Sequence, residues 1–160
     1  MLFRSLGAAA KDTFDALVRI EALRTTPHRA ANGAEYGRDE FSAGLARLAQ
    51  LIKADVGLEA ASIDLPGWDS HFAQQGQVEN LASRLAGGLE AFRRDLGPRM
   101  ATTTVVVMTE FGRTVEENSA FGTDHGRGSA MLVLGGGVAG GRMHGAWHGL
   151  APEKLERRGV

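Results

Sequence analysis

The sequence contains no cysteine among its 160 residues. Disulfide bonds, thiolate zinc sites and cysteine nucleophiles are therefore excluded. It also lacks a surplus of positive charge, because 18 lysines and arginines stand against 19 aspartates and glutamates, for a formal net charge of -1. Nucleic-acid-binding proteins usually gather a basic surplus on one face, so we expect no nucleic-acid partner.

Long hydrophobic runs are missing as well. No window approaches the roughly 20 apolar residues that a bilayer-spanning helix needs, so we expect no membrane span. The first apolar stretch is interrupted by Lys11 and Asp12, unlike the continuous apolar region of a secretory signal peptide. The chain as written therefore predicts a cytoplasmic location.

The chain does contain enough apolar material for a core. Hydrophobic residues make up 43% of the sequence, which argues against disorder. The length fits a single α/β domain over residues 1–160. Apolar residues recur with a period near 3.6 in three segments, which predicts helices at 8–24, 39–54 and 74–96.

Short apolar segments at 61–65, 102–108, 130–134 and 142–147 indicate strands. The run TTTVVVM at 102–108 does not alternate, which is typical of a strand covered on both faces. Helices interspersed with such strands predict an α/β fold with a mostly parallel sheet flanked by helices. Such sheets bind ligands beyond the carboxyl ends of their strands, where we expect the polar clusters described next.

The first polar cluster is PGWDSHF at 66–72. Asp69 and His71 are two residues apart, and residues with this spacing point the same way in extended backbone. A carboxylate and an imidazole that meet one metal suit zinc, manganese or iron. The alternative is a surface turn in which Asp69 caps the following helix and His71 has no role.

The second polar cluster, TEFGR at 109–113, follows the most apolar predicted strand. Glu110 is placed to bind a metal or to act as a base, and the planar guanidinium of Arg113 is suited to an anionic oxygen. These two residues are the catalytic candidates. The alternative is an exposed Glu–Arg pair, which contributes little to stability.

The third polar cluster is GTDHGRG at 122–128. Asp124 and His125 are adjacent, so they reach one metal together only if the flanking glycines permit a turn. Otherwise one residue is a ligand and the other orients it, as carboxylates do for metal-bound histidines. The remaining alternative is an ordinary turn with a solvated aspartate.

Three long segments occur in a characteristic order: IKADVGLEAASIDLPGWDSH, VVVMTEFGRTVEEN and GTDHGRGSAMLVLGGGVAGGRMHG. Through them, the chain resembles a family of bacterial proteins classed as a domain of unknown function. This family is sulfatase-like, belongs to the alkaline phosphatase superfamily and is usually exported by the twin-arginine route. The resemblance implies a phosphatase/sulfatase-like fold and a periplasmic location for family members.

The resemblance also implies a metal-dependent hydrolase-like protein of the phosphatase/sulfatase type, with hydrolysis of phosphate or sulfate esters in the intact parent. In that superfamily, aspartates and histidines commonly bind two metals at the carboxyl ends of strands. The implied cofactor is a divalent metal, zinc, manganese or calcium, and the implied substrate is a small ester. The residues at matching positions, as ligands, as residues that orient them or as an anion site, are Asp69, His71, Glu110, Arg113, Asp124 and His125.

The chain departs from the resemblance in two respects. Family members are usually much longer, and their N-terminal half supplies the nucleophile, so this chain resembles the C-terminal part of a larger hydrolase-like domain. Glu110 and Phe111 also replace the Asp-His pair of true phosphatases. Two alternatives therefore stay open: a non-catalytic exported module for structure or partner binding, and an inactive truncated fragment. Sheet edges left open by a missing half would favour a homodimer.

Overall fold

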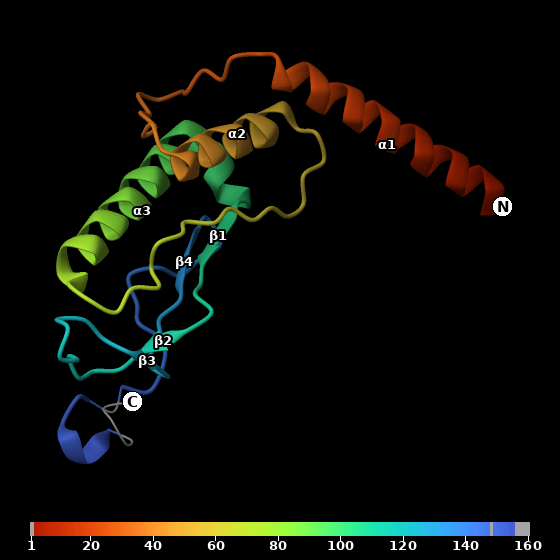
Figure 1. Cartoon of the computed structure of the whole chain (residues 1–160). Coiled ribbons are helices and arrows are strands. Elements are labelled where there is room, and N and C mark those ends of the chain that lie inside the picture. Colours follow the sequence, from red (N-terminus) through yellow and green to blue (C-terminus); the bar gives the residue numbers. More distant parts are fainter. Residues whose placement is uncertain (1, 148, 156–160) are drawn as a thin grey trace. The chain divides into compact units, whose positions relative to one another are not determined.

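The structure is a computed structural model that describes residues 2–147 and 149–155. Its elements are shown in chain order in Figure 1. They are the helices α1 (Leu2–Arg24), α2 (Glu40–Ala54) and α3 (Gln74–Leu96), the 3-10 helix η1 (Gly97–Thr102), the strands β1 (Thr104–Val107), β2 (Gly112–Arg113), β3 (His125–Gly126) and β4 (Leu132–Gly135), and the 3-10 helix η2 (Pro152–Lys154).

The three predicted helices are confirmed, and local signals explain where they begin and end. The side chain of Asp39 caps α2 by accepting a hydrogen bond from the backbone N–H of Ser42, as N-cap aspartates do. Gly97 takes a left-handed conformation directly after α3, with φ of 51°, which favours glycine at a helix end. None of the helices in the described ranges combines the length and apolar character that crossing a bilayer requires.

The predicted fold class, a mostly parallel sheet flanked by helices, is wrong. Helices make up about 44% of the chain, and the strands of the described residues form two antiparallel sheets of two strands each. The two apolar runs pair with each other, so that Val105 of β1 lies opposite Leu134 of β4. Parallel pairing needs a crossover, usually a helix, but residues 108–131 contain no helix and form β2 and β3 instead.

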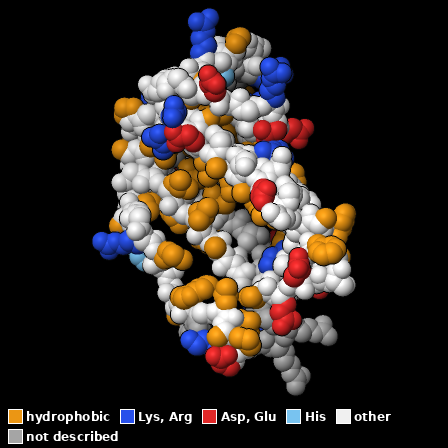
Figure 2. All heavy atoms as spheres, turned by 90° about the vertical axis from the view of Figure 1, so that its left-hand side faces the viewer, with side chains coloured by type: hydrophobic (Ala, Val, Ile, Leu, Met, Phe, Trp, Pro, Cys, Tyr) orange, Lys and Arg blue, Asp and Glu red, His pale blue; other side chains and the backbone are white. Residues whose placement is uncertain are grey.

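The pair β1–β4 also differs from the buried strands that its sequence predicted. Val106, Leu132 and Val133 are 46%, 52% and 46% exposed. Exposed hydrophobic side chains also gather on the face of the molecule that Figure 2 shows. The segments 61–65 and 142–147, also predicted as strands, form none, because a short apolar run becomes a strand only where a neighbouring backbone supplies hydrogen bonds.

The chain divides into two compact units. The first unit comprises Met1–Leu65 and Arg84–Gly97, and the second comprises Pro66–Ser83 and Pro98–Val160. Among the described residues, Leu81 is the one buried hydrophobic residue of the second unit. The hydrophobic core therefore belongs mainly to the first unit, where it consists of Ala34, Phe41, Leu45, Ala49, Ala91, Phe92 and Leu96.

A buried carboxylate joins three segments of the first unit. Asp95 is 1% exposed. Its oxygens lie 2.5 Å from Lys53 Nζ, 2.6 Å from the backbone N of Ala31, 2.8 Å from His28 Nε2 and 3.0 Å from the Tyr36 hydroxyl. Burial raises the pKa of Asp95, but the hydrogen bonds, led by that of Lys53, outweigh burial and lower it overall.

We predict that replacing this carboxylate weakens the fold most at neutral pH. A carboxylate with a lowered pKa stabilises the fold above its unfolded-state pKa of roughly 3.9. That contribution is lost as the pH falls through the lower folded-state value. Asp95→Asn should therefore lower the free energy of unfolding by about 3 kcal/mol at pH 7. Urea unfolding should show this difference shrinking in acid, whereas the exposed Asp12→Asn should have little effect. An equal loss at pH 7 and pH 3 would contradict the assignment.

Two adjacent glycines of α3 differ in what surrounds them. A Cβ on Gly88 would lie 2.6 Å from Phe41 Cε1 and 3.0 Å from Leu45 Cδ1, whereas a Cβ on Gly87 would meet nothing within 4 Å. Phe41 and Leu45 belong to α2 and are buried. Gly88 is thus a position at which the backbone of α3 lies directly against side chains of α2 in the first unit's core.

We predict opposite effects of alanine at these two positions. Gly87→Ala should stabilise the protein by up to about 1 kcal/mol, because alanine is the better helix former. Gly88→Ala should destabilise it, because overpacking costs about 1–3 kcal/mol and exceeds the same helix gain. Urea unfolding monitored by circular dichroism measures both values, and equal effects would show that α2 does not pack on Gly88.

Candidate metal centre

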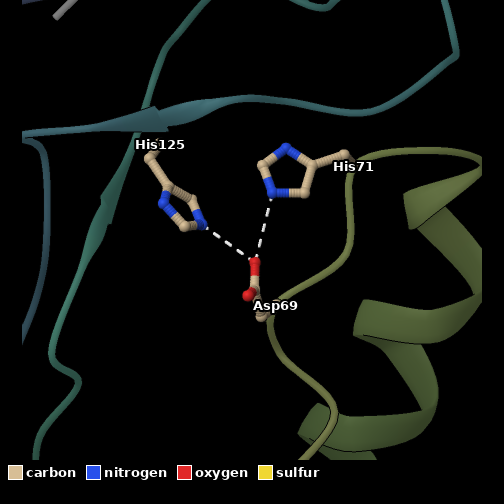
Figure 3. Close-up of side chains that lie close together, drawn as sticks. All are labelled: Asp69, His71 and His125. Carbon is tan, nitrogen blue, oxygen red and sulfur yellow. Dashed lines mark hydrogen bonds and ion pairs between the residues drawn. The ribbon is translucent and has the colours of Figure 1, made fainter.

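Three side chains with metal-ligand chemistry meet in the second unit (Figure 3). Asp69 and His71 lie in the segment that leads into α3. His125 begins β3, where it pairs with Arg113 of β2. The candidate metal centre, defined as Asp69, His71 and His125, therefore combines two segments that are far apart in the sequence.

Both histidines approach one oxygen of the aspartate. His125 Nε2 lies 2.9 Å from Asp69 Oδ1, and His71 Nε2 lies 3.1 Å from the same atom. The ligand atoms of the three residues all lie within 4.8 Å of one another, and their side chains are 45–64% exposed. The hydrogen bond with His125 lowers the pKa of Asp69, and the contact with His71 adds to this against the opposing effect of desolvation.

Asp124 lies behind His71 rather than within the candidate metal centre. Its Oδ1 is 3.2 Å from His71 Nδ1, the ring nitrogen on the other side from Asp69. A hydrogen bond from Asn118, followed by the contact with His71, lowers the pKa of Asp124. His71 thus has a carboxylate at each nitrogen, and Asp124 is placed to orient the ring.

The two segments that carry the ligands are joined by Gln74. This residue is buried, and its Nε2 donates a hydrogen bond to the carbonyl oxygen of Ser70. Its Oε1 accepts hydrogen bonds of 2.8 Å from both the backbone N–H and the hydroxyl of Thr123. Since Ser70 lies between the first two ligands and Thr123 precedes Asp124, one amide fixes both segments.

Backbone contacts complete this junction. The N–H of Ala73 donates to the carbonyl of Ala120 at 2.9 Å. A Cβ on Gly122 would collide with the carbonyl oxygen of His71, so only glycine permits this close approach of the two backbones. The ligand-bearing segments therefore lie in direct contact beside the candidate metal centre.

Arg113 was predicted to bind an anion, but its guanidinium donates hydrogen bonds to backbone carbonyl groups of the protein. Nη1 donates to the carbonyl of Thr123 and Nη2 to that of Trp68, each at 2.7 Å. Nη2 also lies 3.9 Å from Asp69 Oδ1. In the structure, Arg113 ties together the backbones that precede the ligands on both segments.

Glu110, predicted to be catalytic, is exposed in the loop before β2 and is not a member of the candidate metal centre. Its neighbour Phe111 is more closely connected to the site. The Phe111 ring stacks on the His125 ring with centroids 4.5 Å apart, and the guanidinium of Arg113 lies 4.9 Å from the Phe111 centroid. Phe111 therefore restricts the orientation of the His125 ring.

Sequence reasoning missed Gln74, Phe111 and Asn118. An uncharged amide at the start of a helix carries no chemical signal, and the contacts of Gln74 span 49 residues. Asn118 had a usable signal, because asparagine often bonds the backbone two residues on, as it does here with Ala120. Its contact with Asp124 depends on tertiary structure.

Residues 1–159 match the model of a family described as "Protein of unknown function (DUF1501)". The chain belongs to this family. Curated proteins gave no match, and solved structures gave none. The predicted resemblance to a domain of unknown function is confirmed, and the geometry of the DUF1501 chain is the basis for inferring its chemistry.

We predict that Gln74 stabilises the second unit of the DUF1501 chain. Gln74→Ala removes the partner of Ser70 and Thr123 and should lower the free energy of unfolding by about 1–3 kcal/mol, the usual cost of buried polar groups left unpaired. The matched control is Gln75→Ala, whose exposed bond to Glu79 is worth only about 0.3 kcal/mol. Urea unfolding compares the two, and similar losses would count against the role of Gln74.

Proposed function

We propose that Asp69, His71 and His125 bind one divalent metal, and that the protein is a metal-dependent hydrolase acting on phosphate or sulfate esters. The observation that carries the proposal is the approach of both histidine Nε2 atoms to Asp69 Oδ1, at 3.1 and 2.9 Å. A carboxylate and two imidazoles that converge on one point offer a metal three ligand atoms. The resemblance to sulfatase-like proteins supports the ester as the substrate class.

The chemistry of the donor atoms supports a transition metal. Two imidazole nitrogens and one carboxylate oxygen suit zinc, manganese or iron, whereas calcium prefers oxygen ligands throughout. Catalytic zinc sites have three protein ligands and keep another position open. The partial exposure of Asp69, His71 and His125 leaves such a position accessible from solvent. We therefore place zinc first, manganese second and calcium last.

The residues of the chain have separable roles in this proposal. A bound metal would act as a Lewis acid on the ester and stabilise the negative charge of the transition state. Asp124 orients His71 from the rear, and Phe111 stacks on His125 to limit its rotation. Arg113 holds the backbones of both segments, so it positions the ligands through the main chain.

The first prediction from this proposal is metal binding at a single site. Isothermal titration of metal-stripped protein should show one zinc per chain. A zinc concentration 100 times Kd should stabilise the fold by about 2.7 kcal/mol. Asp69→Ala combined with His125→Ala should abolish both effects. The exposed His144→Gln, which changes a histidine outside the candidate metal centre, should preserve them. An unchanged melting temperature of the wild-type protein after zinc or manganese is added would overturn the proposal.

Hydrolysis is tested separately from binding. The zinc-loaded protein should release p-nitrophenol from p-nitrophenyl phosphate or p-nitrophenyl sulfate, with a water activated by the metal as the group that attacks the ester. Release should cease in the Asp69→Ala, His125→Ala variant and persist in His144→Gln. Zinc binding without turnover of either ester would support the metal site and contradict the proposed hydrolase activity. The alternative of a partner-binding module, which the exposed β1–β4 pair favours, would then gain.

A further inference from the structure

Asn118 lies in the loop between β2 and β3, and each end of its side-chain amide has two partners. Its Nδ2 donates to the carbonyl oxygen of His71 at 2.9 Å and to Asp124 Oδ1 at 3.1 Å. Its Oδ1 accepts from the backbone N–H groups of Ala120 at 2.9 Å and Gly122 at 3.1 Å. The amide therefore joins its own turn to both ligand-bearing segments.

Only one orientation of this amide pairs every donor with an acceptor. An amide nitrogen is a donor and an amide oxygen an acceptor. Rotating the group by half a turn would set its oxygen against the oxygens of His71 and Asp124, and its NH2 against two N–H groups. The direction in which Asn118 donates is thus fixed by its surroundings.

The hydrogen bond to Asp124 connects Asn118 to the candidate metal centre. Asp124 Oδ1, the atom that receives it, also faces His71 Nδ1 at 3.2 Å. The opposite ring nitrogen of His71, Nε2, faces Asp69. A continuous series of contacts therefore runs from Asn118 through Asp124 to the His71 nitrogen that is available to a metal.

We propose that Asn118 is a positioning residue for the metal, acting through Asp124 on the ring of His71; this inference rests on the proposed function. Metal-bound histidines usually donate their second N–H to a carboxylate, which fixes the tautomer and the ring orientation. Asn118 donates to the same carboxylate oxygen, Asp124 Oδ1, that faces His71 Nδ1. Without it, the Asp124 side chain, which is 67% exposed, is free to rotate toward solvent.

The test is a double-mutant cycle on the zinc Kd of the full chain, measured by competition with a chelator. Asn118→Ser removes the amide NH2 group that reaches both His71 and Asp124, and keeps a short hydroxyl that can accept a hydrogen bond within the turn. We expect Asn118→Ser and Asp124→Ala each to weaken zinc binding about tenfold, as losing a partner of a metal ligand does. The double variant should bind no more weakly than Asp124→Ala alone, because Asn118 acts through Asp124. The matched control is Asn80→Ser, exposed on α3, with an unchanged Kd.

A spectroscopic measurement separates positioning from a general loss of stability. The visible absorption of cobalt-loaded protein should change in Asn118→Ser in the same direction as in Asp124→Ala, and should be unaffected by Asn80→Ser. Should Asn118→Ser lose the far-ultraviolet circular dichroism of the wild type, Asn118→Asp replaces it. That variant keeps both acceptor contacts and repels Asp124, so it should also weaken zinc binding.

The outcomes distinguish this inference from the proposed function. Zinc binding by the wild type with an unchanged Kd in Asn118→Ser would overturn the positioning role alone. Additive losses in the double variant, or tighter binding by Asn118→Asp, would do the same. Failure of the wild-type chain to bind zinc would overturn the proposed function and this inference together.

Discussion

The candidate site depends on one atom, the Oδ1 of Asp69, to which two histidines from separate segments converge. His71 follows Asp69 by two residues, whereas His125 is 56 residues further along the chain. Such convergence requires that the two segments be held in register. In the second unit, hydrogen bonds of Gln74, Asn118 and Arg113 hold the two segments together. Apolar packing contributes less there, since Leu81 is the one buried hydrophobic residue of this unit among the described residues.

The two units differ in what their side chains contribute: the first supplies most of the buried core, and the second carries the candidate metal centre. The first unit has a hydrophobic core and a buried carboxylate, Asp95, with four hydrogen-bond partners. The second unit supplies polar side chains that orient one another and remain partly exposed. Hydrogen bonds from supporting residues help to fix the rotamers of side chains that form a binding site. The three side chains of the candidate metal centre therefore converge through the protein's own hydrogen bonds.

Local features of the fold could be predicted from the sequence, and pairing could not. The period of the apolar residues predicted all three helices, and Asp39 caps α2 by a local contact. The run that became β1 was recognisable as a strand from its β-branched residues. Its partner and direction depend on what folds between residues 108 and 131, which a periodic pattern does not encode. A parallel sheet was therefore the wrong inference, although the two apolar runs that form β1 and β4 were correctly predicted as strands.

The same distinction holds at the site. The spacing of Asp69 and His71 is local, so their common direction followed from the sequence, whereas the approach of His125 is a tertiary contact. The guanidinium of Arg113 was predicted to face an anion but faces two carbonyl groups, which no sequence pattern specifies.

The most direct measurement is an anomalous difference map from crystals of the protein grown with zinc, recorded at the zinc absorption edge. We expect one peak about 2.0–2.2 Å from His71 Nε2, His125 Nε2 and a carboxylate oxygen of Asp69. A map with no peak among these three residues, from crystals grown with zinc in large excess over protein, would contradict the metal centre.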